Sequence, residues 1–140
     1  MPCVADETDI LGWEKFPVRW TRVYADDEGE SHFSDQDVAL KDAGAIGHLS
    51  EPIAAKSVIF RQNDPGYDYD WHVAPQRQFI VLLDGAIEIE VSDGEKRIIR
   101  GGEVLLMEDT GGKGHRTRHV EPKERHSIFI ILEAEQGNRK

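Results

Sequence analysis

Residues 70–85 of the chain read Asp-Trp-His-Val-Ala-Pro-Gln-Arg-Gln-Phe-Ile-Val-Leu-Leu-Asp-Gly. The segment 79–83 has no polar residue, as expected for a strand that is buried on both faces or lies at the heart of a small barrel. The Asp-Gly pair that follows supplies the backbone conformations of a tight two-residue hairpin turn. Asp70 and His72 lie two residues apart, so in extended backbone they point to the same face. An acidic group and an imidazole therefore lead into a buried strand.

The composition narrows the classes of partner. The chain has 140 residues and a formal net charge of −10, from 27 acidic and 17 basic side chains. Nucleic acids and anionic membranes are bound through basic patches, so this balance argues against both. The sequence has no apolar run of about 18 residues and no basic-then-apolar leader. We therefore expect a soluble, cytoplasmic protein, and the single cysteine, Cys3, excludes an internal disulfide.

From residue 57 onward the sequence is a succession of short strand-like segments and tight turns. Residues 86–91 alternate between small or acidic side chains and Ile or Val, and Asp93-Gly94 then turns the chain. About eight short strands with regularly spaced turn signals predict a sandwich or barrel. No helical periodicity of useful length follows residue 46. We expect one all-β domain with less than about one-fifth helix.

The large apolar residues of these strands are the expected core. They cannot all face inward from one sheet, so several are expected to pack between sheets or at an interface. The set comprises Val58, Phe60, Phe79, Val81, Leu83, Ile87, Ile89, Leu105, Ile130 and Leu132.

Three regions divide the chain. Residues 1–56 are interpreted as an N-terminal extension, residues 57–134 as the barrel core, and residues 135–140 as a charged tail. The extension contains a strand at 18–24 whose two faces are both mixed, which favours an edge or dimer position. Because an exposed strand edge has to be paired or covered, we expect a homodimer.

Two spacing patterns resemble those of the cupin superfamily of small β-barrels. The first family pattern reads Gly, five residues, His-x-His, three or four residues, Glu, six residues, Gly. Gly66 and His72 match its opening, and Gln78 and Gly85 match its end, with glutamine in place of glutamate. Ala74 stands where the family has its second histidine.

The second family pattern reads Gly, five residues, Pro-x-Gly-x-x-His, three residues, Asn. Gly112 and His115 match it, with Thr110 where proline is usual and His119 where asparagine is usual. The resemblance covers residues 57–134. It implies an all-β, single-domain cupin β-barrel, also called a double-stranded β-helix or jelly roll, similar to small cupins of unassigned function.

This resemblance implies a histidine-lined pocket with one divalent metal ion or none. The predicted ligands and catalytic groups are His72 and His115, with Asp70 or Gln78 as the oxygen donor. Asp70 is placed to replace the missing family histidine in a shifted register. Two histidines and one carboxylate form the set that suits ferrous iron, and manganese, zinc and nickel are the other metals considered.

Four residues are candidates for substrate binding, and each has a second interpretation. Gln78 is a ligand or a core amide that hydrogen-bonds His72. Phe60 walls the cavity or is ordinary core packing. Glu108 lines the pocket mouth or belongs to an acidic turn that caps loop amides, and His119 faces the pocket or lies outside the barrel.

Two classes of function follow for a protein whose partner is a small organic molecule. The first is an enzyme, either metal-assisted, with oxygenase, lyase or isomerase chemistry, or metal-free, with acid–base catalysis by His72 and Asp70 together with His115. The second is a non-catalytic barrel that binds a small ligand without a metal. Fold alone does not choose between the two classes.

Overall fold

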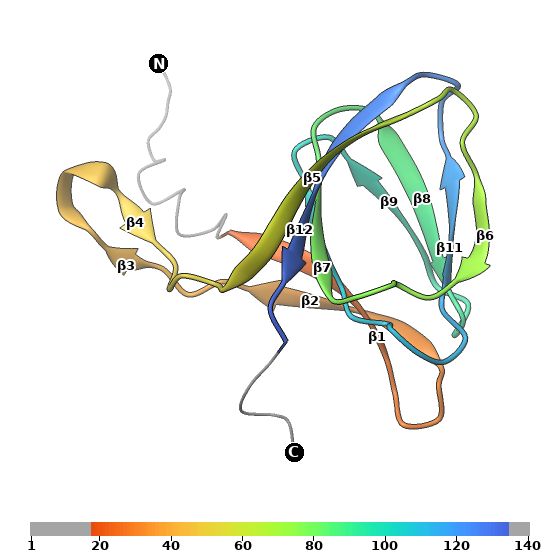
Figure 1. The fold of residues 1–140 in the computed structure, drawn as a ribbon, viewed down its shortest axis with the longest axis horizontal. Helices are drawn as coiled ribbons and strands as arrows, with labels where there is room; N and C mark the ends of the chain where they lie inside the picture. Colours follow the sequence, from red (N-terminus) through yellow and green to blue (C-terminus); the bar gives the residue numbers. More distant parts are fainter. Residues whose placement is uncertain (1–17, 135–140) are drawn as a thin grey trace.

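The computed structural model describes residues 18–134, which form two facing β-sheets and one projecting hairpin (Figure 1). The six-stranded sheet has the order β2 (Ser31–Asp37), β1 (Arg19–Ala25), β10 (Val104–Met107), β7 (Gln78–Leu82), β12 (Arg125–Leu132) and β5 (Ala55–Asn63). The four-stranded sheet has the order β6 (Tyr69–His72), β11 (His115–His119), β8 (Ala86–Val91) and β9 (Lys96–Arg100). The hairpin consists of β3 (Lys41–Asp42) and β4 (His48–Leu49), joined by a single 3₁₀ turn, Gly44–Ile46.

The core lies between the two sheets and confirms the all-β fold. Alternate residues of each strand point into it, as the pleat of a strand requires. Ile87, Ile89 and Val91 of β8 face Leu105 and Met107 of β10 in one continuous apolar cluster, and each is at most 6% exposed. Within residues 18–134, no helix is long and apolar enough to cross a membrane.

Three residues of the expected core are exposed instead. Val58 and Phe60 of β5 are 54% and 75% exposed, and Leu83 is 51% exposed. The cause is position in the sheet, because β5 is an edge strand whose one neighbour is β12. Leu83 has already left β7 and lies beside the Asp84-Gly85 turn. Apolar composition identified these segments as strands, but it does not say which strands have both faces covered.

The strand expected at an edge lies inside the larger sheet. β1 pairs in parallel with β10 and in antiparallel fashion with β2, so the edge position is taken by β2. The segment 31–37 is mostly polar, but it forms a strand from which Ser31 and Phe33 point inward and are buried. The chain ends, including Cys3 and the tail at 135–140, lie outside the described residues.

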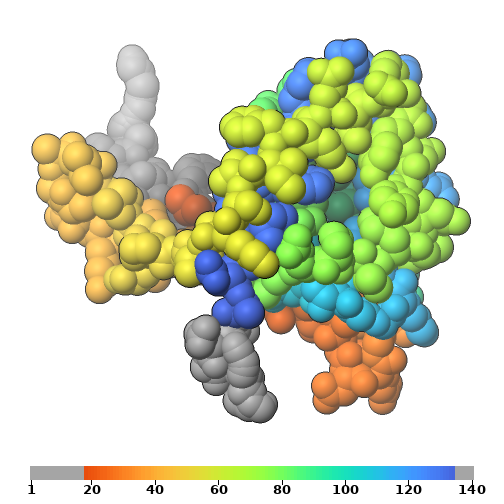
Figure 2. All heavy atoms as spheres, viewed as in Figure 1, coloured from red at the N-terminus to blue at the C-terminus, as the bar shows by residue number. Residues whose placement is uncertain are grey.

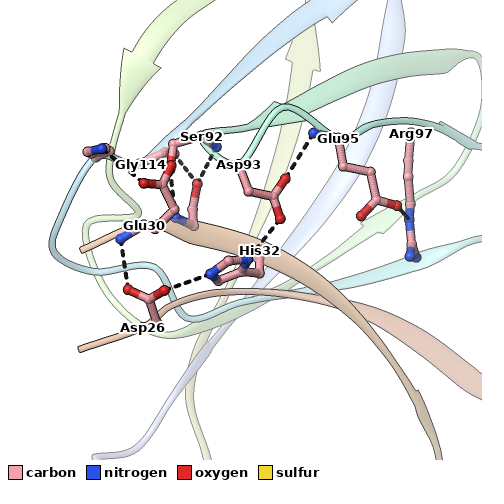
Figure 3. Close-up of polar contacts among 10 residues, drawn as sticks. Asp26, Glu30, His32, Ser92, Asp93, Glu95, Arg97 and Gly114 are labelled. Atoms are coloured by element: carbon pink, nitrogen blue, oxygen red, sulfur yellow. Dashed lines mark hydrogen bonds and ion pairs between the residues drawn. The ribbon is translucent and has the colours of Figure 1, made fainter. Parts of the chain in front are cut away.

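A histidine joins the β1–β2 turn to the β8–β9 turn (Figure 3). The Nδ1 atom of His32 is 2.8 Å from Asp93 Oδ2, and its Nε2 atom is 2.8 Å from Asp26 Oδ2. A carboxylate oxygen only accepts, so both ring nitrogens have to carry a proton and the ring is an imidazolium. The hydrogen bond with Asp26, and then that with Asp93, raises the pKa of His32 above its ordinary value. We call Asp26, His32 and Asp93 the His32 clasp.

Raising the pH is therefore expected to weaken the fold through the His32 clasp. A histidine whose folded-state pKa is raised contributes stability that is complete below about pH 6.5 and is lost as the pH rises through its folded-state pKa. Urea unfolding across the neutral to alkaline range should show a fall in the free energy of unfolding that is smaller in His32→Gln. Identical pH dependence in the two proteins would contradict the charged clasp.

Candidate functional site

A cavity of about 260 Å³ opens between β5 and the segment that leads into β6 (Figure 2). Its apolar wall consists of side chains from both sheets, with Ile80 and Leu105 from the larger sheet and Ile87 and Ile89 from the smaller one. The polar groups on its wall are the side chains of Arg61, Tyr67, Tyr69, His72, Gln78, His115 and Thr117. A mostly apolar cavity with a few polar groups is the usual form of a small-molecule site.

His115 is the first residue of β11, is 4% exposed and lines the cavity. Its Nδ1 atom is 2.6 Å from Oδ2 of Asp109, a carboxylate that is fully buried. The loop 110–114 returns the chain so that Asp109, at the end of β10, meets His115. The backbone carbonyl of Asp109 accepts a hydrogen bond from the Ala74 amide, which fixes this corner of the cavity.

His72 lies opposite His115 in the pairing of β6 with β11. The two imidazole centroids are 4.4 Å apart, with the rings tilted by 57°. Tyr69 stacks on the outer side of His72 at 3.6 Å, and the planes differ by only 10°. The Nδ1 atom of His72 is 2.7 Å from the backbone carbonyl oxygen of Asp70. Backbone pairing and aromatic stacking therefore hold both rings at the cavity wall.

The partners of Nδ1 determine the tautomer of each ring. A carbonyl oxygen and a carboxylate oxygen both accept, so Nδ1 donates in His72 and in His115. In the neutral form, Nε2 is then the unprotonated nitrogen of each ring. Burial lowers the pKa of His72 below its ordinary value, and the neighbouring His115 lowers it further, while the hydrogen bond to Asp70 opposes this. His72 is accordingly neutral at pH 7.

The structure brings together three of the predicted site residues and leaves four apart. His72, His115 and Gln78 line the cavity, and Gln78 is 5% exposed. Phe60 does not reach it, because it projects from the exposed edge strand β5. His119 is turned away and binds Asp68 through Nδ1 at 2.8 Å.

The two predicted carboxylates also lie elsewhere. The Asp70 side chain is 84% exposed and lies 3.9 Å from Arg116. His72 is bound by the backbone carbonyl of Asp70 instead. An irregularity in the pairing of β6 with β11 explains why its carboxylate does not share the face of His72. Glu108 binds Arg22 and Arg77 at a separate surface cleft that Trp20 also lines.

Asp109 is the site residue that the sequence interpretation missed. Its neighbour Glu108 was interpreted as lining the pocket mouth or as part of an acidic turn, and neither interpretation foresaw that the Asp109 carboxylate binds an imidazole. The available signal was its position, directly after the buried strand β10 and one glycine-rich loop before His115. Arg61 and Tyr67 were also missed as cavity residues.

The cavity does not assemble the ligand set expected for a divalent metal ion. Within residues 18–134, no group of three or more His, Cys, Asp or Glu side chains is arranged so that it could hold a metal ion. His72 and His115 supply two imidazoles with oriented Nδ1 atoms, as metal ligands often have. The oxygen donor beside them is the neutral amide of Gln78 rather than a carboxylate. Two histidines and an amide are a poor match to the usual three or four strong ligands.

Comparisons with known proteins give similarity at the level of the fold alone. A sugar phosphate isomerase from a cupin superfamily, from Silicibacter pomeroyi, is 15% identical with a TM-score of 0.46, over 87% of this chain and 74% of its own. A cupin domain protein from Bordetella pertussis is 16% identical with a TM-score of 0.44, over 84% and 96%. A Pseudomonas putida prolyl-4-hydroxylase is 14% identical with a TM-score of 0.41, over 59% and 56%. No family model and no curated protein matches the chain.

The fold class is the one expected from the sequence. Two facing antiparallel-rich sheets enclose an apolar core and a histidine-lined cavity, so the described residues form an all-β fold. What the similar structures bind or catalyse is a property of those proteins. The chemistry available to this chain has to be derived from its own cavity.

Proposed function

We propose that the protein is an enzyme that moves a proton on a small organic molecule held in the cavity, with His115 as the base. The observation that supports it is the buried couple of His115 and Asp109 at the wall of an apolar cavity, where the neutral form of His115 has its unprotonated nitrogen at Nε2. A carboxylate on Nδ1 holds the imidazole in the tautomer that accepts a proton and stabilises the cation that forms. This mechanism is the metal-free acid–base catalysis considered in the sequence analysis, with one difference. The carboxylate that supports the histidine is Asp109 rather than Asp70.

The proposed step is proton removal from a carbon next to a carbonyl group. The C–H bond breaks, the proton passes to Nε2 of His115, and the electron pair moves into the carbonyl to give an enolate. For a substrate with a hydroxyl on the deprotonated carbon, the hydroxyl proton passes to the enolate oxygen and Nε2 returns its proton to the former carbonyl carbon. The product is the isomeric hydroxy carbonyl compound, so no further reactant is needed. The amide of Gln78 and the hydroxyl of Thr117 are the neutral donors on the wall that can stabilise the enolate oxygen.

His72 has a second role in this scheme. Its lowered pKa keeps it neutral, so its Nε2 accepts a hydrogen bond from a substrate hydroxyl without adding a positive charge. A neutral ring also does not repel the cation that forms on His115. The two histidines therefore have different roles: His115 accepts the proton, and His72 orients the substrate.

Deuterium exchange tests the proposal without knowledge of the natural substrate. In D₂O, the protein should catalyse exchange of the C–H hydrogens of a small carbonyl compound, followed by proton NMR. Dihydroxyacetone and pyruvate are suitable probes, one neutral and one anionic. His115→Gln is expected to lower the exchange rate by about 10²–10⁴-fold, the usual contribution of a positioned base.

His126→Gln is the matched control. His126 also binds a carboxylate through Nδ1, with Asp84 Oδ2 at 2.7 Å, but the pair is largely exposed and outside the cavity. This variant should exchange at the wild-type rate. Ligand-dependent shifts of the His72 and His115 NMR signals without any exchange would favour the non-catalytic binding module. A stoichiometric divalent ion in untagged protein, lost in both His72→Gln and His115→Gln, would replace the acid–base mechanism by a metal-assisted one.

A further inference from the structure

Arg125, the first residue of β12, is a buried cation without a hydrogen-bonded acceptor. It is 4% exposed, and its two terminal nitrogens are fully enclosed with no partner among the described residues. Its side chain packs against Gly85, where a Cβ would lie 2.9 Å from Arg125 Cγ. A buried guanidinium whose donors are unpaired is costly, so native proteins nearly always pair it.

The nearest carboxylates do not compensate this charge. Asp68 and Asp84 are the acidic groups whose fields act on Arg125. Asp68 binds the amide and Nδ1 of His119, and Asp84 binds the amide and Nδ1 of His126. Neither lies within ion-pair distance of Arg125. Each of the two carboxylates is therefore already hydrogen-bonded to a histidine on the surface.

Arg61 is a second, partly buried cation, and it lines the cavity itself. Its Nε donates to Ser127 Oγ at 3.2 Å, and its guanidinium carbon lies 4.4 Å from the centre of the Phe129 ring. None of the carboxylates in the described part of the chain forms an ion pair with it within 4.0 Å. Burial lowers the pKa of Arg61, and the proximity of Arg125 lowers it further, while Tyr67 opposes this.

Tyr67 links the two arginines. The guanidinium carbons of Arg61 and Arg125 lie 5.7 Å and 5.6 Å from the centre of its ring, and its own side chain lines the cavity. Such contacts attract a cation without supplying a carboxylate to pair it. Ring contacts continue from Tyr67 to Tyr69 at 6.3 Å and from Tyr69 to His72 at 3.6 Å. The paired cations and the histidines therefore belong to one continuous wall.

We propose that Arg61 and Tyr67 bind an anionic group of the ligand, a carboxylate or a phosphate, at the end of the cavity remote from His115. Arg61 donates to the anion directly, and Arg125, behind Tyr67, adds its positive charge to the same place. The rest of the ligand lies along Ile80, Ile87 and Leu105, with its reactive carbon near His115. This proposal rests on the proposed function and specifies its substrate class, a small organic anion.

Probes of one shape and different charge test the site. Benzoate, phenyl phosphate and the neutral benzamide share a ring and differ in the polar group. At millimolar concentration, benzoate or phenyl phosphate should raise the thermal unfolding temperature of the wild-type protein, and benzamide should raise it less. The more effective anion identifies carboxylate or phosphate as the recognised group. Equal shifts with benzamide and both anions, or no shift with either anion, would overturn the proposal.

Arginine variants locate the binding. Arg61→Gln should weaken anion binding at least tenfold and leave benzamide unaffected, whereas Arg100→Gln removes an exposed arginine of β9 and should change neither. Arg125→Met keeps the apolar part of the side chain and removes the unpaired charge. It should raise the unfolding temperature of the ligand-free protein and weaken anion binding. A lower unfolding temperature would show that the guanidinium already has a partner and would remove Arg125 from the proposal.

The outcomes separate this site from the proposed reaction. Anion binding that depends on Arg61, without deuterium exchange into pyruvate or dihydroxyacetone, would support the anion site and contradict the enzyme. Exchange into dihydroxyacetone that depends on His115, with no binding of either anion, would support the enzyme and contradict the anion site.

Discussion

Replacing Gly114 by alanine is expected to lower the free energy of unfolding by about 3 kcal/mol or more, the sum of a left-handed backbone penalty and overpacking. Gly114 has a φ of +76°, and a Cβ built on it would lie 2.1 Å from the backbone carbonyl oxygen of His72. The obstacle is backbone, which cannot rotate away as a side chain can. β6 and β11 would have to separate at the point where His72 faces His115. Urea unfolding measures the loss.

Gly94→Ala is the matched control for this prediction. Gly94 has a φ of +102°, and a Cβ there would meet no atom within 4 Å. Only the backbone penalty remains, so we expect a loss of about 1 kcal/mol. The NMR signals of His72 and His115 should shift in Gly114→Ala and stay unchanged in Gly94→Ala. If the two variants lost the same stability, the close approach of Gly114 to β6 would be contradicted.

The elements of the fold that follow from local chemistry could be predicted from the sequence. The strand β7 is marked by a continuous apolar run, and β8 by strict alternation of Ile and Val with other side chains. Glycines after aspartate mark the turns because they adopt positive φ, as Gly85 and Gly94 do. The opposition of His72 and His115 was also accessible, through the family spacing that both residues match.

Features that depend on non-local packing were not accessible. β1 joins the larger sheet through a parallel pairing with β10, some eighty residues away, and no local pattern encodes that partner. Phe60 looked like a core residue because its neighbours alternate correctly, yet exposure depends on whether a second sheet covers the strand. The same limit applies to Asp109, whose carboxylate meets His115 only because of the path of the intervening loop.

The polar part of the candidate site shows this limit most clearly. Residue type and spacing suggested that a histidine and a carboxylate would act together, and such a couple is present. Parity along one strand favoured Asp70 as the carboxylate, but the irregular pairing of β6 turns that side chain outward. A hydrogen bond between side chains six residues apart across a loop leaves no periodic signal.

Asp109→Ala is the second change expected to have a large effect. It would leave the Nδ1–H of His115 without an acceptor in a site where the carboxylate is 0% and His115 4% exposed. Leaving a buried donor unpaired costs about 1–3 kcal/mol. We therefore expect a loss of about 2 kcal/mol in urea unfolding. Loss of the oriented tautomer should also abolish the deuterium exchange attributed to His115.

Asp84→Ala provides the comparison, because it removes a carboxylate from a histidine in nearly the same geometry. Asp84 Oδ2 lies 2.7 Å from Nδ1 of His126, but the two side chains are 49% and 43% exposed. Water replaces the lost partner there, so this variant should lose much less stability than Asp109→Ala. It should also keep its deuterium exchange. Nitrogen-15 NMR of the histidines separates the two cases, since only Asp109→Ala should change the proton position on His115. If the two variants lost the same stability, the hydrogen bond of Asp109 to His115 would contribute no more than an exposed one. The proposal that Asp109 orients His115 as the base would then be contradicted.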